Sequence, residues 1–108
     1  MSDERPFIDI GDVPPQQSWE GVVACALHSE RVTLALIELA ANSVVPEHSH
    51  ANEQVGILVR GSFRFRVGDD TETIGSGGTW RIPGGVPHEV EVGPDGAVVV
   101  EIWSPPAR

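Results

Sequence analysis

Short runs of hydrophobic residues alternate with turn-forming residues along most of the chain. Four runs combine β-branched and aliphatic residues as strands do: RVTLALIEL (31–39), QVGILV (54–59), TWRI (79–82) and AVVVEIW (97–103). SFRFRV (62–67) and HEVEV (88–92) alternate strictly between apolar and polar positions, which predicts strands with one buried face. No segment shows a sustained helical period. The stretch 11–19 is the only candidate for a helical turn, and its two prolines favour a loop.

Turn signals separate these runs at short intervals. Glycine, proline and acidic residues predict a break at Arg60–Gly61 and turns at 68–70, 75–78, 83–85 and 93–96. Many short strands with such spacing are typical of a β-sandwich or jelly roll. We therefore predict an all-β jelly-roll barrel, a fold whose interior holds one small ligand when the barrel is small.

The length of the chain limits its organisation. A chain of 108 residues has the usual size of one domain and can bury a core without disulfides or metals. We expect an N-terminal segment with the first strands over 1–30, the barrel over 31–103 and a C-terminal tail over 104–108.

Charge and composition exclude several classes of function. The net charge is −9 and all seven basic residues are arginines, so no basic face for nucleic acid is expected and a Schiff-base mechanism, which needs lysine, is excluded. Cys25 is the only cysteine, so an intrachain disulfide is excluded. The acidic N-terminus does not resemble a signal peptide and no apolar run reaches membrane-spanning length, so we expect a cytoplasmic protein without a membrane partner.

The stretch PEHSHANEQ (46–54) holds the first candidate chemistry. If it is a strand, His48 and His50 project from the same face, about 7 Å apart along the strand, and can chelate one ion. Such a pair alone is more often two surface histidines. A third donor can come from Glu53 or Gln54, of which Gln54 has the parity that matches the histidines.

A second glycine and proline loop, PGGVPH (83–88), places His88 at the start of a predicted strand. With His88 included, three of the four histidines fall at strand ends beside glycine-rich corners, which favours a metal site over surface histidines. His28 has no potential donor nearby in the sequence.

The two segments together resemble the two motifs of the cupin superfamily, and the chain resembles a small single-domain cupin. The first motif, G-x5-H-x-H-x(3 or 4)-E-x6-G, is matched over 42–61 by His48, His50, Gln54 and Gly61. The second, G-x5-P-x-G-x2-H-x3-N, is matched over 77–92 by Gly77, Pro83, Gly85 and His88. Three positions depart from the motifs, where Asn42, Gln54 and Val92 replace a glycine, a glutamate and an asparagine.

This resemblance implies a double-stranded β-helix barrel with one divalent transition metal held by His48, His50, Gln54 and His88. Imidazole-rich sites suit zinc, copper, iron and nickel, and neutral ligands do not select sharply among metals, so the ion is expected to be nickel, iron, manganese, zinc or copper. Four neutral ligands leave the ion its full charge, which strengthens it as a Lewis acid and as an anchor for an anion. The resemblance also implies a small-molecule substrate and a homodimer.

The C-terminal run VVVEIWSPPAR adds a candidate catalytic group. Glu101 and Trp103 share a strand face, so Glu101 is either a proton-transfer group beside the metal or a solvated carboxylate on an edge strand. The run resembles, more weakly, the ending of the uronate-linearising cupins of pectin and alginate breakdown. That resemblance implies Lewis-acid chemistry on an unsaturated uronate or a related sugar acid, with Arg108 or Arg60 holding the carboxylate. The alternatives are a dioxygenase-type cupin and a cupin that binds a ligand or metal without catalysis.

Parity predicts the sides on which three arginines lie, and two tryptophans are assigned from their residue type. Arg60 shares its parity with Gln54 and Leu58 and is expected to face the interior. Arg64 and Arg66 are expected to face solvent, since they alternate with phenylalanines. Trp19 and Trp80 are expected to be aromatics of the core or its rim.

Overall fold

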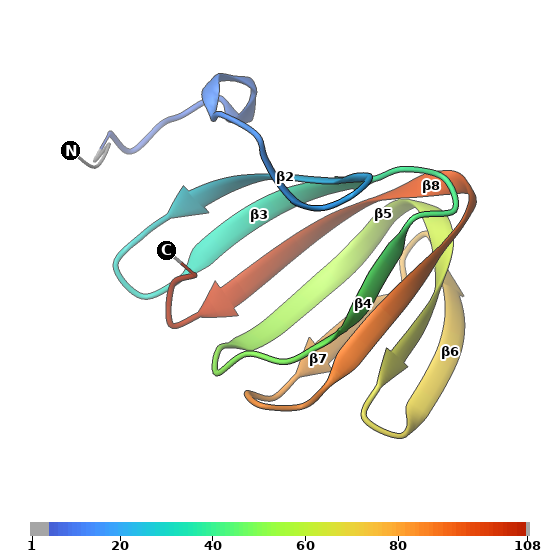
Figure 1. Cartoon of the computed structure of the whole chain (residues 1–108). Coiled ribbons are helices and arrows are strands. Elements are labelled where there is room, and N and C mark those ends of the chain that lie inside the picture. The colour runs from blue at the N-terminus through green and yellow to red at the C-terminus, as the bar shows by residue number, and fades with distance from the viewer. Residues whose placement is uncertain (1–4, 108) are drawn as a thin grey trace.

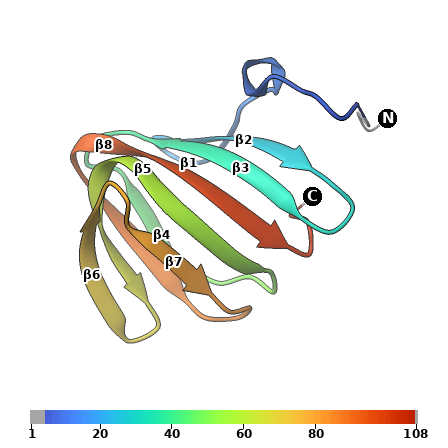
Figure 2. The same cartoon turned by 180° about the vertical axis from the view of Figure 1, so that it is seen from behind.

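The computed structural model describes residues 5–107, which form one antiparallel sheet of eight strands that folds over on itself (Figures 1 and 2). A 3₁₀ turn (Ile10–Asp12) precedes the strands β1 (Gln16–Trp19), β2 (Val22–His28), β3 (Thr33–Leu39), β4 (Val44–His48), β5 (Glu53–Val67), β6 (Asp70–Gly75), β7 (Thr79–Ile82) and β8 (His88–Ser104). The prediction of an all-β jelly-roll fold is confirmed. Within 5–107, no helix is long and apolar enough to cross a membrane.

The two longest strands, β5 and β8, run through both layers of the folded sheet (Figure 1). In one layer, the C-terminal half of β8 lies between β3 and the N-terminal half of β5, with β2 and β1 beyond β3 and β7 beyond β5. In the other layer, the N-terminal half of β8 lies between β4 and the C-terminal half of β5, and β6 follows. The two layers enclose the core.

The predicted break at Arg60–Gly61 and the tight turn at 93–96 are wrong, because each lies inside a continuous strand. Val92 pairs with Phe63 and Ala97 pairs with Gly61, so residues 93–96 form a bulge opposite a single residue. Gly61 has φ +93°, and a Cβ there would lie 2.0 Å from the carbonyl oxygen of Gly96. The turn-like residues therefore bend the strands from one layer to the other instead of ending them.

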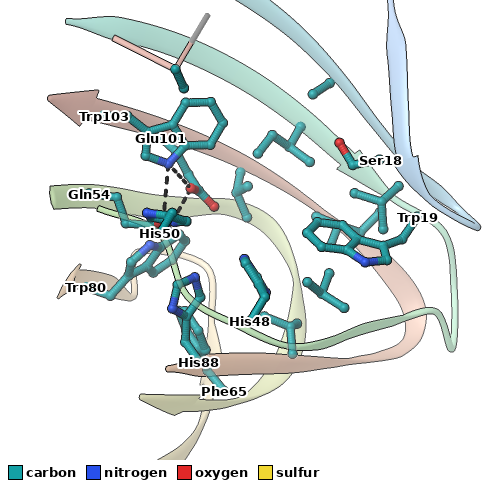
Figure 3. Close-up of a pocket in the computed structure, with 18 of the residues that line it drawn as sticks. Ser18, Trp19, His48, His50, Gln54, Phe65, Trp80, His88, Glu101 and Trp103 are labelled. Carbon is teal, nitrogen blue, oxygen red and sulfur yellow. Dashed lines mark hydrogen bonds between the residues drawn. The ribbon is translucent and has the colours of Figure 1, made fainter. Parts of the chain in front are cut away.

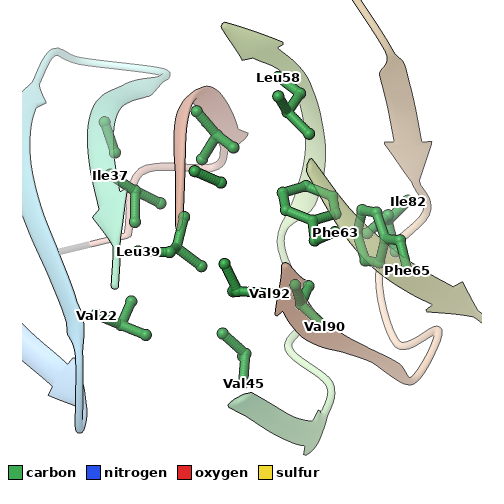
Figure 4. Packing of buried hydrophobic residues seen from close by; sticks show 13 residues of the cluster. Val22, Ile37, Leu39, Val45, Leu58, Phe63, Phe65, Ile82, Val90 and Val92 are labelled. Atoms are coloured by element: carbon green, nitrogen blue, oxygen red, sulfur yellow. The ribbon is translucent and has the colours of Figure 1, made fainter. Parts of the chain in front are cut away.

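The core is built from alternating positions that face between the layers (Figure 4). Phe63 and Phe65 are buried while Arg64 is exposed, as the alternation of SFRFRV predicts. The rings of Phe63 and Phe65 meet edge to face, with centroids 5.5 Å apart. The other buried hydrophobic residues are Val22, Ala35, Ile37, Leu39, Val45, Leu58, Ile82, Val90, Val92, Ala97 and Val99.

Two local features, the segment 11–19 and the turn at Asn42, bear on expectations from the sequence. The loop expected over 11–19 is only partly correct, because Gln16–Trp19 forms β1, whose hydrogen bonds come from pairing with β2. Asn42, which replaces a motif glycine, has φ +61°. Asparagine tolerates this left-handed conformation better than other non-glycine residues, so the turn keeps its geometry.

Candidate metal centre

Three of the four histidines meet where β4 ends and β8 begins (Figure 3). His48 is the last residue of β4 and pairs in register with His88, the first residue of β8. One ring nitrogen from each of His48, His50 and His88 lies within 4.8 Å of those of the other two. His50 follows the end of β4, so the turn after the strand brings it to the cluster, and strand alternation is not the cause.

A backbone carbonyl two residues away orients each imidazole. The Nδ1 atoms lie at hydrogen-bond distance from carbonyl oxygens: His48 from Pro46 (2.9 Å), His50 from Asn52 (3.0 Å) and His88 from Val86 (2.9 Å). A carbonyl oxygen only accepts, so Nδ1 carries the proton and Nε2 of the neutral ring keeps a free lone pair. All three rings are thus in the tautomer that binds a metal through Nε2.

His88 gives the first test of whether a cation fits. The residue is 3% exposed, and its Nε2 is buried without a hydrogen-bond partner. Burial lowers the pKa of His88, and the neighbouring His48 and His50 lower it further, which favours the neutral ring. A buried lone pair without a donor is costly, and a metal ion would satisfy it.

Gln54 gives the second test. Trp103 donates its indole N–H to Oε1 of Gln54 (3.2 Å), and Nε2 of Gln54 donates to Oε2 of Glu101 (2.8 Å), so the amide orientation is fixed. Oε1 then lies 2.7 Å from Nε2 of His50. Both atoms are acceptors in the neutral state, and they repel each other unless a proton or a cation lies between them. The set of three imidazoles and an amide oxygen therefore fits a divalent transition metal.

Strand parity decides which of Glu53 and Gln54 can act as a donor beside the histidines. Gln54 is 4% exposed and faces the histidines, whereas Glu53 is exposed on the opposite side of β5.

Glu101 lies beside this cluster, on the half of β8 that is enclosed between β3 and β5. It is half-buried and lines the same cavity as the histidines, so it does not lie on a solvated edge strand. Burial raises the pKa of Glu101 to about 7, although the hydrogen bond from Trp103 favours the ionised form. In the metal-free protein the carboxyl group is poised between its two protonation states at neutral pH.

A cavity of about 280 Å³ opens beside the histidines and extends between the two layers. All three tryptophans of the chain line it, with Trp19 on β1, Trp80 on β7 and Trp103 on β8 (Figure 3). The Trp19 and His48 ring centroids are 4.8 Å apart. No pattern in the sequence indicated this role of Trp19, because β1 is mostly exposed and exists through its pairing with β2.

The expectation that Arg60 faces the interior is wrong. A bulge between Leu58 and Arg60 reverses the parity of β5, so inward positions change from even numbers (Gln54, Leu58) to odd ones (Phe63). Arg60 is exposed and borders a separate depression with Glu38.

The other residues considered in the sequence analysis lie away from the cluster or outside the described residues. Arg108 lies outside the described residues. Arg64 and Arg66 approach Glu91 and Glu89 on the outer side of the sheet, as expected. His28 is exposed, and its Nδ1 lies 2.8 Å from Oγ1 of Thr33, away from the cluster.

Comparisons with known proteins identify one matching family and several similar structures. A family model described as "Cupin domain" matches residues 35–104. KdgF from Halomonas sp. has a similar structure, with a TM-score of 0.83 and 17% identity over 94% of each chain. An RmlC-like cupin from Shewanella frigidimarina NCIMB 400 has a TM-score of 0.87 and 20% identity, over 97% of this chain and 95% of that one.

Oxalate decarboxylase from Bacillus subtilis is also similar, with a TM-score of 0.82 and 19% identity. The match covers 91% of this chain but 28% of that longer one. At these identities the likeness shows the fold alone. No curated protein matches the sequence.

Proposed function

We propose that this chain, which belongs to the cupin domain family, is an enzyme that uses one divalent transition metal to act on a small anionic molecule. The observation that carries this proposal is the buried Nε2 of His88, which has no partner although it faces two other histidines. The convergence of His50 Nε2 and Gln54 Oε1 supports it independently.

His48, His50 and His88 would hold the metal through Nε2, and Gln54 would complete the set through Oε1. A divalent ion there would act as a Lewis acid on a substrate oxygen, and the four neutral ligands would leave its charge uncancelled. The donors suit nickel, iron, manganese, zinc or copper. Their roles as ligands are part of the proposal.

Glu101 would move a proton. Its carboxyl group borders the cavity and contacts Gln54 at 2.8 Å, so a group that can accept and donate a proton lies beside the proposed metal site. Isomerase or lyase chemistry needs such a group, and the C-terminal resemblance favours an unsaturated uronate as the first substrate to test. Arg108 stays a prediction for the carboxylate of that substrate, because no arginine lines the cavity among the described residues. The cytoplasmic location also stays a prediction.

Elemental analysis of the purified protein tests the metal site. We expect about one divalent ion per chain in the wild type and in His28→Ala, and none in His88→Ala. His28 is a matched control, because it is a histidine of the same chain that lies outside the cluster. An equal metal content in both variants would contradict the site.

Activity assays then separate the reaction classes. A change in the ultraviolet absorbance of an unsaturated uronate, lost in Glu101→Gln, is the expected result for proton-transfer chemistry. Oxygen uptake with an enol or a diketone would instead indicate a dioxygenase-type reaction. A metal-loaded protein that does neither would indicate a binding function.

We also propose that two copies pair through the outer face of β2, β3, β8 and β5. Among the described residues, six large hydrophobic side chains on this face are 37–49% exposed: Val23, Leu34, Val55, Ile57, Val59 and Ile102. Leu34, Ile102 and Val55 are direct neighbours across three strands. Glu38 and Arg60 border the same face, so a two-fold arrangement can pair opposite charges while the apolar side chains are covered.

A further inference from the structure

The polar groups of the cavity are concentrated at one end. The histidine cluster, Gln54 and Glu101 lie together (Figure 3), whereas aliphatic side chains line much of the rest of the cavity. Those side chains come from Val22 and Ala24 on β2, Ile37 and Leu39 on β3, and Val45 on β4. The cavity thus has a polar head and an apolar body.

This distribution of polar and apolar groups disfavours a ligand that carries many hydroxyl groups. Each hydroxyl that leaves water needs a hydrogen-bond partner, and the aliphatic wall offers none. Outside the polar end, the other polar groups among the described residues that line the cavity are the side chains of Ser18 and Asn52 and the indole N–H groups of Trp19 and Trp80. The side chain of Asn52 already donates to the carbonyl oxygen of Pro105 (2.6 Å).

The size and the aromatic walls favour a compact apolar group. The cavity measures about 280 Å³. An apolar cavity of roughly 150 Å³ is enough for benzene, so a ring and a small acidic head fit together. Trp19 and Trp80 offer ring surfaces against which a planar group can pack.

We infer that the ligand is a small carboxylic or keto acid whose oxygen atoms lie at the histidine cluster and whose body is an aromatic ring or a branched aliphatic chain. The assignment of the head group rests on the proposed function. The assignment of the body rests on the size of the cavity and on its aliphatic and aromatic walls. A polyhydroxylated sugar acid, including the uronate that the C-terminal resemblance favours, matches the head and not the wall, so on this inference the uronate is a poorer ligand than an acid with an apolar body.

Tryptophan fluorescence measures binding directly, because all three tryptophans line the cavity. The metal-loaded protein is titrated with phenylpyruvate, pyruvate and glucuronate, which share an acidic head and differ in their bodies. We expect phenylpyruvate to bind at least about tenfold more tightly than either of the others, because only its ring buries apolar surface. Glucuronate binding as tightly as phenylpyruvate would overturn the inference.

Two neighbouring positions on β2 provide matched variants. Ala24→Leu fills the cavity and is expected to weaken phenylpyruvate binding at least about tenfold. Val23→Leu adds bulk on the outer face and is expected to leave binding unchanged. Ala24→Val, a smaller insertion with an intermediate effect, replaces Ala24→Leu if that variant does not fold. Equal binding by the Ala24 and Val23 variants would contradict the location of the body.

Failure of the metal site and failure of this inference give different results. The metal-free protein is titrated with benzyl alcohol, a neutral probe without an acidic head. Binding that is lost in Ala24→Leu supports the apolar site whether or not the protein holds a metal. Absence of benzyl alcohol binding to wild-type protein would overturn the inference even if the metal content is as proposed.

Discussion

The carboxyl group of Glu101, which lies inside the cavity, makes the stability of the metal-free protein depend on pH. Burial raises its pKa from the usual 4.5 to about 7 in the folded state. Because the folded pKa lies above the unfolded one, the folded state binds the proton more tightly, and stability falls as pH rises from about 4.5 to about 7. One pKa unit corresponds to about 1.4 kcal/mol, so full ionisation costs roughly 3 kcal/mol.

Glu101→Gln removes this cost while keeping the size of the side chain. The amide oxygen can still accept from Gln54 and Trp103, as Oε2 of Glu101 does at 2.8 and 3.1 Å. Below pH 4.5 the wild type carries a neutral carboxyl group there, so the two proteins should be equally stable. Above pH 7 the variant should be more stable by roughly 3 kcal/mol, which is a large share of the stability of a small domain.

Urea unfolding of both metal-free proteins between pH 4.5 and pH 8.5 measures this difference. His88, whose lowered pKa acts in the opposite direction, is present in both proteins, so its contribution largely cancels in the comparison. A difference that stays constant across this range would refute the reasoning, because it would mean that the pKa of Glu101 is the same folded and unfolded. A bound divalent ion should reduce the difference, since a nearby positive charge favours the carboxylate.

Three further predictions concern the surroundings of the site and the outer face. Trp103→Phe removes the N–H that fixes Oε1 of Gln54, so we expect metal affinity, measured by competition with a chelator, to fall about tenfold; unchanged affinity would mean that Gln54 is held without it. Gly56→Ala places a Cβ 2.4 Å from the ring of Trp80, and urea unfolding should show a loss of about 1–3 kcal/mol; a neutral effect would mean that the indole moves freely. Ile57→Arg puts a charge on the exposed apolar face and should convert a dimer to a monomer in light scattering at unchanged metal content; a monomeric wild type would contradict the proposed pairing.

The sequence alone was sufficient for the fold class and for grouping the three histidines of the candidate site. Strand periodicity and turn residues depend on local backbone chemistry, so the alternation of Phe63, Arg64 and Phe65 correctly predicted which side chains are buried. The spacing of His48, His50 and His88 indicated that they belong together. The shared parity of Glu101 and Trp103 predicted that both lie on one face, and both line the cavity.

The tertiary structure decided what depends on contacts between distant segments. The bulge that turns Arg60 outward forms where β5 bends between layers, and parity counting cannot detect the inserted residue. Trp19 reaches the cavity because β1 pairs with β2, and the Gln54 amide is oriented by two residues about fifty positions away. Within an uninterrupted strand, local sequence indicates which side chains share a face, whereas bulges and the opposing layer determine where that face points and what its side chains meet.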